Sequence, residues 1–215
     1  MKLFTTTALM MAMCSFVMAQ ATTTEKKPAE KSAMTHDHDK AAAPAGMEMA
    51  KPSAEAQKLY SMVGIWSATV KTEPGPWGKG GTDKGSMTVT KAPGGFGVEQ
   101  NFKANGSMGP FTGHGTLWWD KTAQQYKGLW CDSMGGCMTS TSKMEGDKKW
   151  TVEMQEAEMN GKKVHSTING SMSDDNNSMH EEFMQSFDGS PATKTMSIDY
   201  KRIGKAMAAK PAGKQ

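Results

Sequence analysis

Apolar and polar residues alternate with a period of two over most of the chain between residues 64 and 203. This period places successive side chains on opposite faces of a strand, so the pattern predicts β-structure. The alternation is clearest near the end, where Ile198 and Tyr200 share one face while Ser197 and Asp199 share the other. The predicted strands span residues 64–72, 84–91, 95–104, 112–120, 124–131, 137–145, 148–157, 162–170, 177–187 and 193–203.

Turn signals and a short helix complete this pattern. Asn160-Gly161 stands between two alternating runs, and both residue types tolerate the positive φ of a tight hairpin. Ser53 predicts the N-cap of a short helix at 54–62, where Leu59 and Met62 are available to pack. A meander of antiparallel strands exposes its edges unless the sheet closes. The sequence therefore predicts an all-β fold, a closed antiparallel up-and-down β-barrel of about ten strands with a short N-terminal helix.

Other segments lie outside the predicted domain of residues 54–203. An apolar run at 8–19 follows a positive start, and small residues allow cleavage after residue 19 or 21. The run is too short for a membrane span of about 20 residues, so it predicts a signal peptide at 1–19. Residues 20–53 and 204–215 are rich in Ala and Lys and show no apolar periodicity, which predicts a disordered tether and a disordered basic tail. We expect an exported protein, periplasmic or secreted, with no membrane-spanning segment.

The charge balance excludes one class of partner. The 215 residues contain 25 Lys and Arg against 22 Asp and Glu, a net charge of +3, without a basic cluster. Such a chain lacks the electrostatic footprint of a nucleic-acid-binding protein, and we expect no nucleic-acid partner.

The two ends of the strand pattern carry a resemblance to a known fold. Gly64-Ile65-Trp66 opens the first predicted strand, and Arg202 stands at the end of the last. This pairing resembles the Gly-x-Trp signature of lipocalin-like (calycin) barrels. The resemblance implies that Trp66 closes one end of the barrel and that Arg202 packs over it.

The middle of the chain resembles a particular family. Residues 107–115 read Ser-Met-Gly-Pro-Phe-Thr-Gly-His-Gly, and Trp119-Asp120, Tyr126 and the run 130–135 follow. This order is similar to the bacterial domain of unknown function 1579. The resemblance covers nearly all of residues 54–203 and implies a lipocalin-like barrel in an exported bacterial protein, without lending an activity. Its structural signature consists of Gly64, Trp66, Asp132, Ser133, Met134, Gly135 and Arg202, and three residues depart from the pattern, namely His114, Cys131 and Cys137.

Two cysteines remain once the signal peptide is removed with Cys14. Cys131 and Cys137 flank a short hairpin loop, and facing positions on paired strands bring Cβ atoms near disulfide distance, about 4 Å. Export favours oxidation, so we predict a structural disulfide, with metal-binding thiols as the alternative. The loop residues Asp132–Gly135 suit turn capping by Asp and Ser side chains. A place at the barrel mouth, with Asp132 orienting a ligand, is the second interpretation.

The leading functional hypothesis is a binding module that holds a small, largely apolar ligand, because a barrel of about eight or more strands can enclose a cavity. The side chains whose parity favours the interior are Phe102, His114, Trp118, Tyr126, Trp130, Trp150 and Phe183. No nucleophile–base pair stands out, so we predict no catalytic residue. An enzyme acting on a lipophilic substrate, with His114 and Asp120 or Asp132 near the mouth, remains an alternative.

Two other classes of function remain open. Imidazole and thioether ligands suit copper, and the tether carries His36, His38, Met47 and Met49; His114 could instead bind haem iron. The loose spacing of these residues makes copper or haem a lesser alternative to a protein without a cofactor. The last alternative is a packed barrel that presents its surface to a protein partner in the cell envelope.

Overall fold

The computed structural model describes residues 50–75, 78–106, 109–159 and 161–206. The predicted signal peptide, most of the tether with its His and Met residues, and the tail from residue 207 lie outside the described residues. A short helix and 3₁₀ turn, α1 (Ala54–Lys58) and η1 (Leu59–Met62), precede the sheet, and a second 3₁₀ turn, η2 (Pro93–Gly95), joins two strands. The strands are β1 (Gly64–Thr72), β2 (Gly81–Lys91), β3 (Gly97–Gly106), β4 (Gly109–Asp120), β5 (Gln125–Asp132), β6 (Cys137–Glu145), β7 (Lys149–Met154), β8 (Ala157–Met159), β9 (Lys162–Met172), β10 (Ser178–Phe187) and β11 (Thr193–Gly204).

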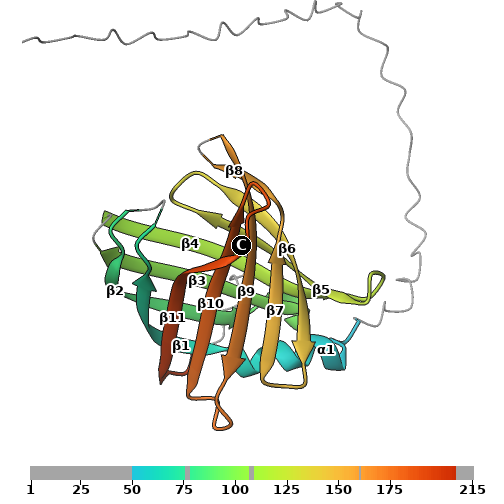
Figure 1. Ribbon diagram of the computed structural model, residues 1–215. Coiled ribbons are helices and arrows are strands. Elements are labelled where there is room, and N and C mark those ends of the chain that lie inside the picture. The colour runs from blue at the N-terminus through green and yellow to red at the C-terminus, as the bar shows by residue number, and fades with distance from the viewer. Residues whose placement is uncertain (1–49, 76–77, 107–108, 160, 207–215) are drawn as a thin grey trace, which may run out of the picture. The chain divides into compact units, whose positions relative to one another are not determined.

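The strands form a closed antiparallel barrel of ten strands, which confirms the predicted fold class (Figure 1). Neighbours along the chain pair with one another, and β1 pairs with both β2 and β11. Pairing of β10 with β9 completes the ring. Closure satisfies the backbone groups that an open sheet would leave at its edges.

The eleventh strand, β8, continues β7 along the same neighbour. Both pair with β9, but the five residues from Glu153 to Ala157 face the four from Thr167 to Val164. This one-residue shift is a β-bulge, and it divides the strand that the sequence predicted as one piece. A hairpin is present at this predicted turn, since Met159 pairs with Lys162 and Gly161 has a φ of +74°, while Asn160 lies outside the described residues.

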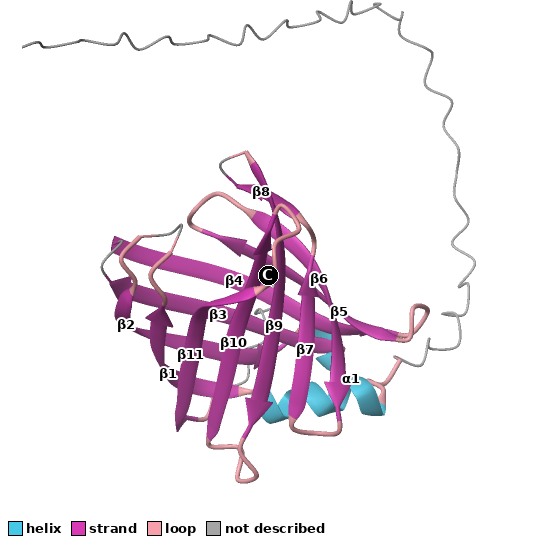
Figure 2. Ribbon diagram, viewed as in Figure 1, coloured by secondary structure: helices cyan, strands magenta, loops and turns pink. Residues whose placement is uncertain are grey.

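Helix α1 and turn η1 cover one end of the barrel (Figure 2). The Ser53 hydroxyl accepts a hydrogen bond from the Ala56 amide at 3.2 Å, which is the predicted N-cap. Leu59 and Met62 are buried against the core, as the sequence indicated. We call this the closed end.

Trp66 and Arg202 seal the closed end in the way that the calycin resemblance implied. Trp66 is fully buried, and the Arg202 guanidinium lies 4.0 Å from the centre of its ring. Arg202 also donates hydrogen bonds to the carbonyls of Val63 at 2.6 Å, Ser61 at 2.8 Å and Asn176 at 2.8 Å. A Cβ at position 64 would collide with this guanidinium, so the position requires glycine. Burial lowers the pKa of Arg202 from its usual value.

The disulfide predicted between Cys131 and Cys137 is present at the opposite end, which we call the open end. The two residues are paired across β5 and β6, with Cα atoms 4.1 Å apart. Within the part of the chain that the structure describes, no helix is long and apolar enough to cross a membrane.

Candidate ligand site in the barrel interior

Alternate residues of every strand face the inside of the barrel, and their burial differs between the two ends. Close to α1, Trp66, Val89 and Val98 have exposed fractions of 0%, whereas Trp119 beside Tyr126 is half-buried. Toward the open end the large inward side chains that pack on this core are only half-buried. They include Phe111, Trp130, Phe183 and Met196. Large apolar side chains that face inward yet reach solvent provide apolar surface that a small ligand can cover.

Glycines on β4 make room for the largest of these side chains. A Cβ at Gly113 would lie 2.1 Å from Cζ2 of Trp130, and one at Gly115 would lie 2.8 Å from its Cε3. The Trp130 indole therefore lies flat over the inner side of β4. Its N–H donates a hydrogen bond of 3.3 Å to Asp132, which holds the ring in place.

A polar cluster lies among these apolar residues, nearer the closed end. The Tyr200 hydroxyl donates a hydrogen bond of 3.1 Å to the Glu181 carboxylate, and the Trp150 indole is also hydrogen-bonded to it. The strand register sets Glu181 opposite Gly170, which is opposite Trp150. A Cβ at Gly170 would lie 1.9 Å from the Trp150 indole nitrogen, so the glycine allows the ring to lie beside the carboxylate.

Burial dominates the electrostatics of this cluster. Loss of solvation raises the pKa of Glu181 above its ordinary value, and the hydrogen bonds from Tyr200 and Trp150 partly oppose that rise. The pKa of Tyr200 is raised well above its usual range by burial and by the neighbouring carboxylate. Glu181 is thus an acidic group held in a largely apolar interior.

One buried hydroxyl of the inner face has no partner. Ser142 on β6 is 5% exposed, and among the described residues its Oγ makes no hydrogen bond. Ser142 stands one inward step along β6 from Met144, which pairs with Trp150. An unsatisfied buried hydroxyl costs about 1–3 kcal/mol, and at functional sites such a group is often met by a ligand.

Comparison with known proteins identifies the family of this barrel. A model of a protein family of unknown function, DUF1579, matches residues 51–202. The chain belongs to the DUF1579 family. No curated protein sequence matches it.

Two solved structures match this DUF1579 protein in a comparison of structures. The crystal structure of Rv2717c from M. tuberculosis matches with a TM-score of 0.51 at 12% identity, over 71% of this chain and 99% of that one. A de novo designed fluorescence-activating β-barrel matches with a TM-score of 0.34 at 14% identity, over 67% of this chain and 96% of that one.

The DUF1579 signature around Asp132 organises a turn. Asp132 Oδ1 accepts a hydrogen bond of 2.9 Å from the Met134 amide, and Ser133 Oγ accepts one of 3.1 Å from Thr112. Gly135 has a φ of +90°, which suits glycine. Met134 is exposed. These contacts match the turn-capping interpretation of the motif.

Five of the seven residues predicted to line the interior do face inward, and they differ in how far they are buried. Trp130 and Phe183 are half-buried on the inner face, as expected. Phe102, Tyr126 and Trp150 also face inward but are fully packed, with exposed fractions of 4–6%. The Tyr126 hydroxyl bonds to the Glu55 carbonyl of α1 at 3.1 Å, so this side chain belongs to the closed end.

His114 and Trp118 are a correction to the sequence prediction. Both lie on the outer face of β4, because Phe111, Gly113 and Gly115 take the inward positions. His114 is exposed, and its Nδ1 is 3.1 Å from the side-chain oxygen of Asn101. The prediction of an inward His114, and with it the expectation of a haem ligand inside the barrel, is therefore wrong.

The other described histidines also face outward. His165 contacts Glu153 at 3.1 Å, and His180 Nδ1 lies 2.7 Å from Asp199. Within the described ranges, no group of three or more His, Cys, Asp and Glu residues could hold a metal ion. The copper ligands predicted in the tether, His36, His38, Met47 and Met49, lie outside those ranges.

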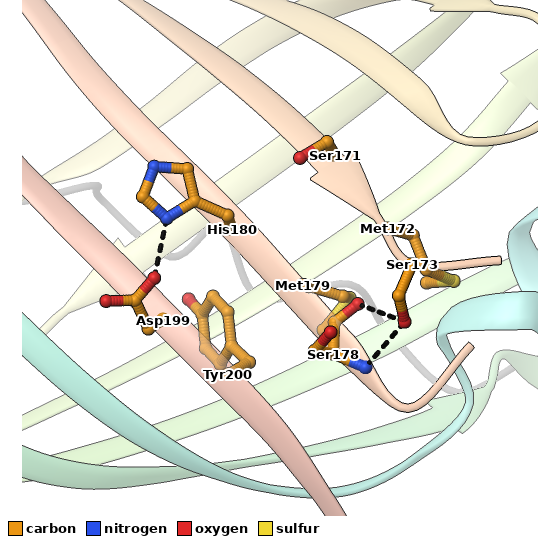
Figure 3. A pocket seen from close by; sticks show the side chains of 8 residues that line it. All are labelled: Ser171, Met172, Ser173, Ser178, Met179, His180, Asp199 and Tyr200. Carbon is orange, nitrogen blue, oxygen red and sulfur yellow. Dashed lines mark hydrogen bonds and ion pairs between the residues drawn. The ribbon is translucent and has the colours of Figure 1, made fainter. Parts of the chain in front are cut away.

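A shallow depression of about 330 Å³ brings Ser171, His180 and Asp199 together on the outer surface (Figure 3). These residues stand opposite one another across β9, β10 and β11. The second imidazole nitrogen of His180 is 3.7 Å from Glu182, a carboxylate, and makes no hydrogen bond to Ser171. The row therefore lacks the nucleophile–base contact of a catalytic triad.

Glu181 and Tyr200 are site residues that the sequence prediction missed. The signal was present, because the period of two puts Glu181 on the same face as Met179 and Phe183. A carboxylate in an otherwise apolar alternation is a mark of a functional interior position.

Proposed function

We propose that this DUF1579 protein binds a small, largely apolar molecule inside the barrel. The observation that carries the proposal is the half-burial of Phe111, Trp130, Phe183 and Met196 on the inner face, toward the open end. Covering such surface is favourable by about 25 cal/mol per Å². A ligand in contact with these side chains would gain that free energy without a change in the fold.

Polar groups within the same interior argue against a pure hydrocarbon. Gln185 Nε2 donates a hydrogen bond of 3.1 Å to Ser166, and Glu181, Tyr200 and Ser142 stand nearer the closed end. Binding sites of small molecules combine apolar walls with a few polar groups that orient the ligand. We therefore expect a ligand with an apolar body and a limited number of polar atoms.

The test uses the full protein and a neutral hydrophobic dye, N-phenyl-1-naphthylamine. Saturable enhancement of the dye's fluorescence, with one site per chain, is expected. The Trp130→Ala variant should bind about tenfold more weakly, which corresponds to about 1.4 kcal/mol or the loss of roughly 55 Å² of apolar contact. Trp118→Ala removes an aromatic ring of the outer face and serves as the matched control.

Two results would contradict the proposal. One is the absence of saturable enhancement by a protein whose circular dichroism shows a folded barrel. The other is equal weakening by Trp130→Ala and Trp118→Ala, since dye on the outer surface would not distinguish the inner ring.

We also propose that binding takes place outside the cytoplasm. The disulfide between Cys131 and Cys137 supports this proposal, because such bonds persist in oxidising compartments. The intact mass of the protein from its own host is the test. Loss of residues 1–19 or 1–21 is expected, and a full-length mass in the soluble cell fraction would contradict export.

A further inference from the structure

The charge of the barrel interior narrows the ligand class. By register, the inner-face positions of the strands carry the carboxyl groups of Asp83, Asp132 and Glu181 and, among those described, the basic side chains of Lys91, Lys162 and Arg202. The Arg202 guanidinium is held in the closed end by its carbonyl partners and by Trp66. Lys91 lies over the Tyr60 ring, and Lys162 is exposed at the first position of β9, so among the described residues no Lys or Arg is paired with Glu181.

Glu181 differs from three carboxylates of the outer surface that each lie near a lysine. Asp120 lies 3.0 Å from Lys127, Glu182 lies 3.7 Å from Lys194, and Asp199 lies 3.8 Å from Lys71. Within the described ranges Glu181 has no Lys or Arg partner. The titratable neighbour on its own strand, His180, points to the outer face and contacts Asp199.

The hydrogen bonding of Glu181 leaves it able to accept more donors. A carboxylate has about four acceptor positions, and the Tyr200 hydroxyl and Trp150 indole occupy two. Both neighbours donate, so the cluster presents only acceptor capacity to a ligand. Glu181 is half-buried among apolar side chains, and a carboxylate in such surroundings gains from pairing with an opposite charge.

We propose that the ligand is an amphipathic amine, whose ammonium group binds Glu181 while its apolar body lies against Phe183 and Trp130. This inference rests on the proposed function and adds the chemistry of the ligand's polar end. Phe183 is the next inward residue after Glu181 on β10, about 7 Å along the strand. From Glu181 to Phe187 the strand runs about 20 Å toward the open end, which is ample length for a ten-carbon chain.

The experiment compares three molecules with the same apolar body and different head groups. Decylammonium, decanol and decanoate, each below its micelle concentration, compete with bound N-phenyl-1-naphthylamine at pH 7. For the full wild-type protein, decylammonium should displace the dye at a concentration at least about tenfold lower than decanol, because an ion pair in a desolvated site contributes more than a neutral hydrogen bond. Decanoate should be the weakest of the three, since it would meet Glu181 with like charge.

Matched variants locate the effect. Glu181→Gln keeps the size of the side chain and an oxygen for Tyr200, and it should reduce the preference for decylammonium over decanol to less than about threefold. Glu182→Gln changes the adjacent carboxylate, which faces outward, and should leave the preference unchanged. Binding of decanol to all three proteins should remain similar.

Each outcome separates the inference from the proposed function. If the three molecules displace the dye from the wild-type protein equally well, the amine inference is wrong while the ligand-binding function stands. If Glu181→Gln and Glu182→Gln lower the preference equally, general surface charge explains it and Glu181 is not the anchor. If the dye does not bind at all, the proposed function itself fails. If the Glu181→Gln variant does not fold, the order in which decylammonium, decanol and decanoate displace the dye from the wild-type protein still tests the preference for an amine.

Discussion

The two ends of this barrel are built from similar residues and differ in what those residues contact. At the closed end, Trp66 has no exposed surface and is sealed by Arg202 and by α1 with η1. At the open end, Trp130 lies over glycines of β4 and remains half-buried. The comparison teaches that one end carries stability, and the other leaves apolar surface available for a ligand.

The polar groups of the interior also differ between the ends, in how many of their hydrogen-bonding atoms have a partner. Every nitrogen of the Arg202 guanidinium has a carbonyl partner at the closed end. Further along the interior, the Ser142 hydroxyl has none among the described residues, and Glu181 lacks a basic partner there. Satisfied polar groups fix a structure, whereas under-satisfied ones are the groups to which a ligand can add.

Removal of one tryptophan from each end should show the largest contrast. Trp66→Ala is expected to lower the free energy of unfolding by about 3–5 kcal/mol, because it leaves a large cavity beneath Arg202. Trp130→Ala should cost about half as much, since its ring is partly solvated already. Urea denaturation of both variants measures the difference, and equal losses would mean that the two ends contribute alike.

Exchange of Arg202 for lysine tests how much the contacts of the guanidinium at the closed end contribute to stability. Arg202→Lys keeps the positive charge but cannot reach the carbonyls of Ser61, Val63 and Asn176 together, and we expect a loss of about 2–3 kcal/mol. The unfolding free energy in urea is the measurement. Dye affinity should be preserved, and a large loss of affinity would place the binding site at the closed end instead.

Removal of the disulfide between Cys131 and Cys137 tests how much the rim of the open end contributes to stability. Its loop is short, so replacing both Cys131 and Cys137 by serine should lower the unfolding free energy by about 2 kcal/mol, according to the loop-entropy relation. Thermal unfolding of the double variant, with the wild-type protein under reducing conditions as a parallel, is the measurement. A loss as large as that of Trp66→Ala would make the rim as important for stability as the closed end.

Removal of the Ser142 hydroxyl, which lacks a hydrogen-bond partner among the described residues, is expected to stabilise the protein rather than destabilise it. Ser142→Ala removes a buried group without a hydrogen bond and should raise the unfolding free energy of the ligand-free protein by up to about 1 kcal/mol. Chemical denaturation compares it with Ser140→Ala, the neighbouring inward serine on β6. A loss of stability would show that the Ser142 hydroxyl is satisfied in solution.

Glu181 links stability to pH. Its pKa is raised in the folded protein, so the folded state binds the proton more tightly, and the contribution of this group to stability decreases as pH rises past its ordinary pKa of 4.5. Glu181→Gln abolishes that decrease. The variant should therefore gain stability relative to the wild type from pH 4 to pH 7, as measured by urea denaturation. A constant difference across this range would mean that burial does not perturb the carboxyl.

Local patterns in the sequence predicted more of the fold than of the site. The period of two located all ten strands of the barrel, but it predicted one unbroken strand at 148–157, where β7 ends at Met154 and β8 begins at Ala157, because a bulge has no reliable sequence signal. The hairpin that pairs Met159 with Lys162 and the Ser53 cap were recognisable because the signals for them are confined to a few neighbouring residues. The disulfide was predictable because Cys131 and Cys137 flank a single hairpin.

By itself, the sequence determined which residues share a face, because that follows from strand geometry alone. Only the tertiary structure decided which face turns inward, since a period of two separates the two faces of a strand without showing which one faces the barrel interior. For β4 the choice followed from the Trp130 ring, which needs Gly113 and Gly115 beneath it and so sends His114 outward. The same long-range packing brought Glu181, Tyr200 and Trp150 together from three strands, and no local pattern contains that contact.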